Sequence, residues 1–199
     1  MHTAPAASSW VQRWSHLVAP EARVLDLASG SGRHVRWFAQ RGCRVTAVDR
    51  DAAAVRPLAA LAEVVVADLE GAAWPLTQRE FDAVVVANYL WRAVLPRVVA
   101  SLAESGVLIY ETFSAGQERL GKPSNPDFVL RTAELLELTR GLRVVAFEEG
   151  FEAAPQRHVQ RIVAVREPPV ANAPVRYALS PPNPGQGRVK SAEQEDHCP

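Results

Sequence analysis

A glycine turn between two apolar runs constrains the fold more than any other feature of this chain. Residues 24–29 read Val-Leu-Asp-Leu-Ala-Ser and lead into Gly30-Ser31-Gly32; a helical pattern and a second apolar run follow, and that run ends on Asp49. A strand, a glycine turn, a helix and a strand that ends on an acid form the opening βαβ unit of a nucleotide-cofactor fold. The glycines let the backbone approach a ligand closely, and the acid is placed to bind both hydroxyls of a ribose.

Apolar runs and helical patterns alternate along most of the chain. This alternation predicts a parallel sheet with helices on both faces. The last two strands have no helix between them, and a link of about ten residues predicts an antiparallel hairpin with a broad loop. The fold class is therefore α/β, a Rossmann-like sheet of seven strands, mostly parallel, whose last strand is antiparallel. The expected strands are 23–27, 44–48, 64–67, 81–87, 106–113, 142–148 and 159–166.

Helical patterns are expected between most of these strands. A first helix begins at Ser8 or Ser9 and carries four apolar residues at helical spacing. Asp51 is expected to cap a helix that carries Val55, Leu58 and Leu61. The others are expected at about 32–41, 93–102 and 131–140.

One domain over residues 8–166 accounts for all of this patterning. Residues 1–7 are small and are expected to be flexible. Residues 167–199 contain seven of the 15 prolines and no periodic apolar face. We therefore expect a Pro-rich disordered tail after residue 166.

Charge and cysteine content limit the classes of binding partner and the cellular compartments that are expected. Lys and Arg together number 22 and balance 22 Asp and Glu, so the chain has no general attraction to nucleic acid or to anionic membranes. The two cysteines, Cys43 and Cys198, do not predict a structural disulfide, which favours a reducing compartment. The chain shows no signal peptide and no apolar run that would span a bilayer, so a cytoplasmic location is expected. No metal site is expected, and the oligomeric state stays open.

Polar residues gather where the expected strands end. Asp49, Asp68 and Asn88 end the second, third and fourth strands, at the edge where open α/β sheets bind ligands. The dinucleotide fingerprint G-x-G-x-x-G fails here because its third glycine is replaced by Val35. Asp26, just before the turn, would repel a pyrophosphate and suits a cationic ligand without phosphate, such as S-adenosylmethionine. An NAD(P)-dependent oxidoreductase remains the alternative from another class.

These residues carry a resemblance to a family. The run from Val24 to Gly32 resembles the first motif of class I S-adenosylmethionine-dependent methyltransferases, D/E-x-G-x-G-x-G, with Ala28 in place of the first glycine. The final hairpin also matches that class, and the resemblance covers about residues 8–166. Ser-Gly-Arg-His at 31–34 and Asn-Tyr-Leu-Trp-Arg at 88–92 are similar to small stand-alone bacterial methyltransferases of the tellurite-resistance type.

The resemblance implies an activity and a set of cofactor contacts. It implies transfer of a methyl group from S-adenosylmethionine to a small-molecule acceptor, or, as a further alternative, a non-catalytic module that binds this cofactor. It implies that Asp49 binds the ribose hydroxyls and that Arg50 flanks the adenine. The remaining implied contacts are Asp26, Ala28, Gly30 and Gly32 on the methionine portion, Asp68 and Leu69 on the adenine edge, and Asn88, Tyr89 and Leu90 over the sulfonium.

The acceptor is expected beyond the fourth and fifth strands. The connection 114–128 is long for a compact domain, and such loops are often lids. Alternatives stay open: Trp10 would roof the pocket or pack the first helix, Arg92 would bind an anion or brace helices, and the loop charges would face water. The catalytic candidates are Tyr89 and Glu111, and the substrate-binding candidates are Trp10, Arg92, Phe113, Arg119 and Lys122.

Overall fold

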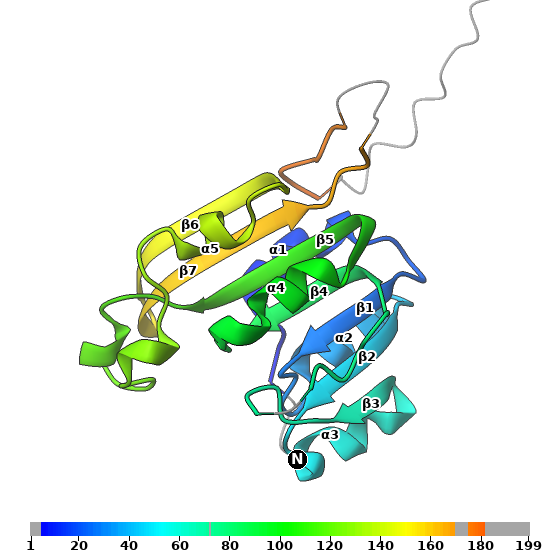
Figure 1. Cartoon of the computed structure of the whole chain (residues 1–199), viewed down its shortest axis with the longest axis horizontal. Coiled ribbons are helices and arrows are strands. Elements are labelled where there is room, and N and C mark those ends of the chain that lie inside the picture. Colours follow the sequence, from blue (N-terminus) through cyan, green and yellow to red (C-terminus); the bar gives the residue numbers. More distant parts are fainter. Residues whose placement is uncertain (1–4, 72, 170–174, 182–199) are drawn as a thin grey trace, which may run out of the picture.

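The computed structural model describes residues 5–71, 73–169 and 175–181, and its centre is one seven-stranded sheet in the order β3-β2-β1-β4-β5-β7-β6 (Figure 1). Strand β1 pairs in parallel with β2 and β4, whereas β7 pairs antiparallel with β5 and β6. The predicted fold class is therefore confirmed. The strands are β1 (Arg23–Leu27), β2 (Arg44–Asp49), β3 (Ala62–Val66), β4 (Phe81–Ala87), β5 (Leu102–Phe113), β6 (Arg143–Ala153) and β7 (Gln156–Val165).

Short helices connect these strands. They are α1 (Ser9–Trp14), α2 (Arg33–Gln40), α3 (Ala52–Val55), α4 (Leu95–Ala100) and α5 (Glu134–Leu138), with 3₁₀ turns at Ser15–Leu17, Arg56–Ala60, Arg92–Val94, Gln117–Arg119 and Pro126–Phe128. Ser8 caps α1, since its hydroxyl accepts a hydrogen bond from the Val11 N–H. The expected helix through Leu61 is shorter in the structure: α3 ends at Val55, a 3₁₀ turn follows, and Leu61 lies beyond it with 47% of its surface exposed.

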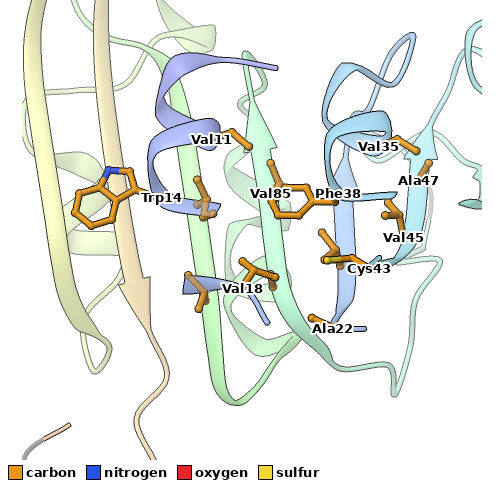
Figure 2. Close-up of a cluster of buried hydrophobic side chains, with 14 of the residues drawn as sticks. Val11, Trp14, Val18, Ala22, Val35, Phe38, Cys43, Val45, Ala47 and Val85 are labelled. Atoms are coloured by element: carbon orange, nitrogen blue, oxygen red, sulfur yellow. The ribbon is translucent and has the colours of Figure 1, made fainter. Parts of the chain in front are cut away.

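Two apolar clusters cover the two faces of the sheet. One cluster packs α1 and α2 on the same face of the sheet. Val11 and Trp14 come from α1, and Val35 and Phe38 come from α2 (Figure 2). The opposite cluster includes Leu95 and Val98 of α4 and Leu135 of α5. Neighbouring residues of β1 contribute to opposite faces, so this strand is buried on both sides, as its continuous apolar run predicts.

The final hairpin differs from the expectation. Only Ala154 and Pro155 separate β6 from β7, so the prediction of a broad loop is wrong. The two strands extend through residues that have no apolar alternation, and cross-strand pairs hold them together. Phe151 packs on His158 with ring centroids 5.1 Å apart, and Glu152 forms an ion pair with Arg157.

The ends of the described chain contact the domain. Ala7 is buried, and its carbonyl accepts a hydrogen bond from Gln12 at 2.6 Å, although residues 1–7 were expected to be flexible. Within the expected tail, Tyr177 packs against the α1-side cluster, and the Ala178 carbonyl lies 2.9 Å from His16 Nε2. Residues 1–4, 170–174 and 182–199, which include Cys198, lie outside the described residues. Across the described ranges, no helix has the length and apolar character needed to cross a membrane.

Gly32, which begins α2 at φ 78°, supplies a test of this packing. A Cβ at Gly32 would lie 2.4 Å from Leu58 Cδ1, so Gly32→Ala combines left-handed strain with a clash and should lower the free energy of unfolding by about 2–4 kcal/mol. Gly42, at φ 80°, has open space at its Cβ position, so Gly42→Ala should lower it by only about 1–2 kcal/mol. Urea unfolding measures both, and equal losses would contradict the packing against Leu58.

Candidate functional site

The turn after β1 lies at the edge of the sheet where the strand order reverses. The chain passes from β1 to β2 on one side, while β4 pairs with β1 on the other, and this switch point is where open α/β sheets bind ligands. Ala28, Gly30 and Gly32 all have left-handed backbone angles, with φ of 55°, 53° and 78°. A non-glycine residue rarely adopts this conformation, which explains in physical terms why the related motif has glycine where this chain has Ala28.

A cavity of about 180 Å³ opens beside this turn. It brings together residues from the ends of β1, β2, β3 and β4, as the strand-end pattern predicts. Six of the eight lining residues were expected there. Ala67 and Glu70 were not, although they flank the expected pair Asp68-Leu69 in sequence. The lining residues are Ala28, Asp49, Arg50, Ala67, Asp68, Leu69, Glu70 and Tyr89.

The main chain fixes the carboxylate of Asp49. Its Oδ2 accepts a hydrogen bond from the Gly30 N–H at 2.7 Å, and its Oδ1 accepts one from the Asp51 N–H at 2.8 Å. Each carboxylate oxygen has a second lone-pair position, so both keep an acceptor site for a ligand. Asp49 therefore presents two oriented acceptors toward the cavity, which matches the geometry of vicinal hydroxyls.

The cavity is acidic. Asp49, Asp68 and Glu70 line it with one cation, Arg50, whose guanidinium lies 3.8 Å from Glu70. Burial raises the pKa of Tyr89, and the charges of Glu70 and Asp68 raise it further. The phenol thus stays protonated and is a hydrogen-bond donor, not a base. Among the described residues its buried hydroxyl has no hydrogen-bond partner.

Behind the turn, Asp26 and His34 are buried together. Asp26 Oδ1 lies 3.8 Å from His34 Nδ1, and both residues are nearly inaccessible to solvent. The Ser8 N–H donates to His34 Nε2 at 3.3 Å, which assigns the ring hydrogen to Nδ1, the nitrogen that faces Asp26. Within the described part of the chain, Asp26 Oδ2 and Ser29 Oγ have no partner. The segment before α1 is thus fastened beside the glycine turn.

Several candidate residues do not line this cavity: the expected cofactor contacts Asp26, Gly30, Gly32, Asn88 and Leu90, and the substrate candidate Trp10. Asn88 is exposed and has φ 55°, so its backbone shapes the turn after β4. Leu90 is 4% exposed and packs in the cluster on the α4 side. Trp10 is 2% exposed in the α1-side core, where its indole N–H points to the Ile162 carbonyl at 3.5 Å, so the structure favours the packing alternative for Trp10.

Glu111 lies within an ion-pair network. Its carboxylate accepts a hydrogen bond at 3.3 Å from Arg161, which also contacts Glu148 and Glu152. Glu111 is 1% exposed and does not line the cavity. The structure therefore separates the two catalytic candidates: Tyr89 borders the cavity, and Glu111 is bound to Arg161.

Arg92 clamps the connection that follows β5. Its guanidinium donates to both carboxylate oxygens of Glu134, at 2.7 and 2.9 Å, and to the carbonyls of Asp127 and Val129. Gln117 provides a second clamp, because it donates to the Lys122 carbonyl and accepts from the His158 N–H. The segment 114–128 is therefore held at several points, and the alternative in which Arg92 braces structure matches these contacts.

A second cavity, about 540 Å³ in volume and wide open to solvent, lies against this clamped segment. It contains Phe113 and Lys122, two of the residues expected to contact the acceptor. The side chain of Arg119 is 87% exposed and lies outside it. The lining residues are Phe113, Lys122, Pro123, Ser124, Asn125 and Phe128.

Comparison with known proteins agrees with this geometry. Residues 24–106, from β1 into β5, match the family model described as a methyltransferase domain. The solved structure of TehB from Haemophilus influenzae is similar, with a TM-score of 0.66 and 17% identity; the match covers 83% of this chain and 64% of TehB. The match to the methyltransferase model thus spans β1 to the first part of β5, and the fold is that of TehB. The chain spans less than two thirds of the length of TehB.

Other solved structures share this fold. A TehB-like S-adenosylmethionine-dependent methyltransferase from Corynebacterium glutamicum has a TM-score of 0.58 and 19% identity, covering 79% of this chain and 87% of that one. A Burkholderia thailandensis 1,6-didemethyltoxoflavin-N1-methyltransferase, solved with that compound and S-adenosylhomocysteine, has a TM-score of 0.59 and 22% identity, covering 80% and 76%. A search of curated protein sequences found no significant match.

The Arg92–Glu134 clamp predicts a pH dependence. Burial raises the pKa of Glu134, but hydrogen bonds from Arg92 and from the Arg131 N–H outweigh it and hold the pKa at about 2, below the ordinary 4.5. A lowered pKa stabilises the folded state fully above pH 4.5, and this contribution disappears as the pH falls toward 2. Glu134→Gln should therefore lower the free energy of unfolding by about 1–3 kcal/mol at pH 7 and weaken its decline below pH 4.5.

Urea unfolding at several pH values measures this effect. Glu137→Gln is the matched control, because Glu137 lies on the same helix with a side chain 59% exposed. It should change the free energy of unfolding by no more than about 0.5 kcal/mol. If the free energy of unfolding declined with falling pH in the same way in Glu134→Gln and in the native chain, the lowered pKa of Glu134 would be contradicted.

Proposed function

We propose that this chain binds S-adenosylmethionine in the cavity beside the glycine turn and transfers its methyl group to a small molecule in the cytoplasm. The observation that carries the proposal is the carboxylate of Asp49, held by two backbone N–H groups with both oxygens open to a ribose. The proposed methyltransferase domain is residues 8–166. The neighbour crystallised with 1,6-didemethyltoxoflavin supports a small-molecule acceptor.

The chemistry of the cavity fits this cofactor. Three carboxylates against one guanidinium suit a ligand that has a positive sulfonium and no phosphate, and they oppose a pyrophosphate. The volume, about 180 Å³, is below the roughly 300–1,000 Å³ of complete small-molecule sites, so it corresponds to the nucleoside part. The unpartnered Asp26 Oδ2 and Ser29 Oγ behind the turn supply acceptors for the methionine part.

In the proposed mechanism, most of the rate enhancement comes from holding the cofactor and the acceptor in position. Bound S-adenosylmethionine supplies an electrophilic methyl group on a positively charged sulfur. Asp49 would hold the ribose of the bound cofactor, and the protonated Tyr89 would act as a hydrogen-bond donor at the cavity wall. Aligned reactants can gain roughly 7–11 kcal/mol over free encounter, so the reaction needs no dedicated base for a good nucleophile.

Two alternatives have weaker support. An NAD(P)-dependent oxidoreductase needs a pyrophosphate at the turn, where the buried Asp26 opposes it, and a small residue at the third fingerprint position, where the fully buried Val35 packs in the core. A non-catalytic module would bind S-adenosylmethionine and show no turnover with any acceptor. The second, larger cavity favours the enzyme over that module, because it leaves room for an acceptor.

Asp49 gives the direct test. Isothermal calorimetry should show that S-adenosylhomocysteine binds the native chain and that Asp49→Ala weakens its affinity at least about tenfold, through lost ribose hydrogen bonds. Glu104→Ala removes an equal charge from an exposed position of β5 and should leave the affinity unchanged. Absence of binding by the native chain at millimolar concentration would overturn the proposed function, and an unaffected Asp49→Ala variant would overturn the role of Asp49.

A further inference from the structure

We propose that the second cavity binds the methyl acceptor, and that this acceptor is an aromatic ring carrying an acidic group. The inference rests on the proposed function. It draws on three features of the described residues: two phenylalanines in one cavity, a lysine on its rim, and a connecting segment that is folded before any ligand arrives.

Phe113 and Phe128 supply the apolar part of the site. Phe113 ends β5, and Phe128 ends the 3₁₀ turn Pro126–Phe128, so the two rings come from opposite ends of the connecting segment. Both residues are partly exposed, whereas Phe38 and Phe81 are buried in the core. Partly exposed rings in one cavity suit a flat apolar ligand, because aromatic pairs prefer offset or edge-to-face contacts.

Lys122 supplies the charge. Apart from Lys190, which lies outside the described residues, it is the only lysine of the chain. No Asp or Glu in the described ranges lies within 4.0 Å of its ammonium group, whereas most nearby arginines are in ion pairs. An unpaired ammonium beside an apolar cavity favours a ligand that carries a negative charge at one end.

The fold places this cavity on the reactive edge of the sheet. β5 lies next to β4, and the residues after β4 include Tyr89, which borders the cofactor cavity. The Tyr110 hydroxyl donates to the Tyr89 carbonyl at 2.8 Å, which ties the end of β4 to β5. The two cavities thus lie at the carboxyl ends of neighbouring strands, and Figure 1 shows the connection after β5 extending from this edge.

Two ligands with the same ring system, one charged and one neutral, measure the contributions of the aromatic ring and of the negative charge to binding separately. Calorimetry would compare 2-naphthoate with its uncharged analogue 2-naphthamide on the full chain. The native chain should bind naphthoate about two- to fivefold more tightly, which is the range for a partly exposed ion pair. Lys122→Gln should remove this preference, Lys122→Arg should retain it, and Phe128→Ala should weaken both ligands about two- to tenfold.

Controls make each outcome decisive. Arg140→Gln removes an exposed positive charge away from the cavity and should leave both affinities unchanged. A thermal unfolding midpoint close to that of the native chain shows that a variant is folded. If Phe128→Ala does not fold, Phe128→Leu is measured in its place. No binding of either ligand at millimolar concentration, or binding that is indifferent to Phe128 and Lys122, would overturn the inference. Binding of S-adenosylhomocysteine in the same preparations reports on the proposed function independently.

Discussion

The hydrogen bond from the Gly30 N–H to Asp49 is the contact on which the site depends. It joins the turn after β1 to the end of β2, so the ends of these two neighbouring strands are fixed relative to each other. Ala28, with its left-handed backbone, and Gly32, which begins α2, lie on either side of this contact in the turn. A carboxylate held by backbone donors loses little freedom when a ligand arrives, which is what a preorganised site requires.

The two cavities are built by different means. The cofactor cavity is shaped by the main chain of parallel strand ends, whose positions are fixed by the hydrogen-bonded sheet. The second cavity depends on side chains that are distant in sequence: Arg92 reaches Glu134 and two carbonyls of the connecting segment. Such contacts can change without disturbing the sheet, so one scaffold accommodates different acceptors.

The sequence predicted what depends on local pattern. Apolar runs located the strands, and the positions of Gly30 and Asp49 at strand ends predicted that both lie at one edge of the sheet. The hydrogen bond between them is visible only in the folded chain. The tight hairpin between β6 and β7 was missed because cross-strand pairs such as Glu152 with Arg157 leave no apolar periodicity. The pairing of Arg92 with Glu134 could not be predicted from the sequence either, since the two residues are 42 positions apart and only the folded chain brings them together.

The clamp on the connecting segment has a consequence for how a ligand is received. A loop that must fold over its ligand uses part of the binding free energy to restrict its own chain. Here Arg92 and Gln117 already hold the segment at both ends. A ligand that binds in the second cavity, as proposed, would meet a wall that is already in place, so its association would not wait for a loop to close.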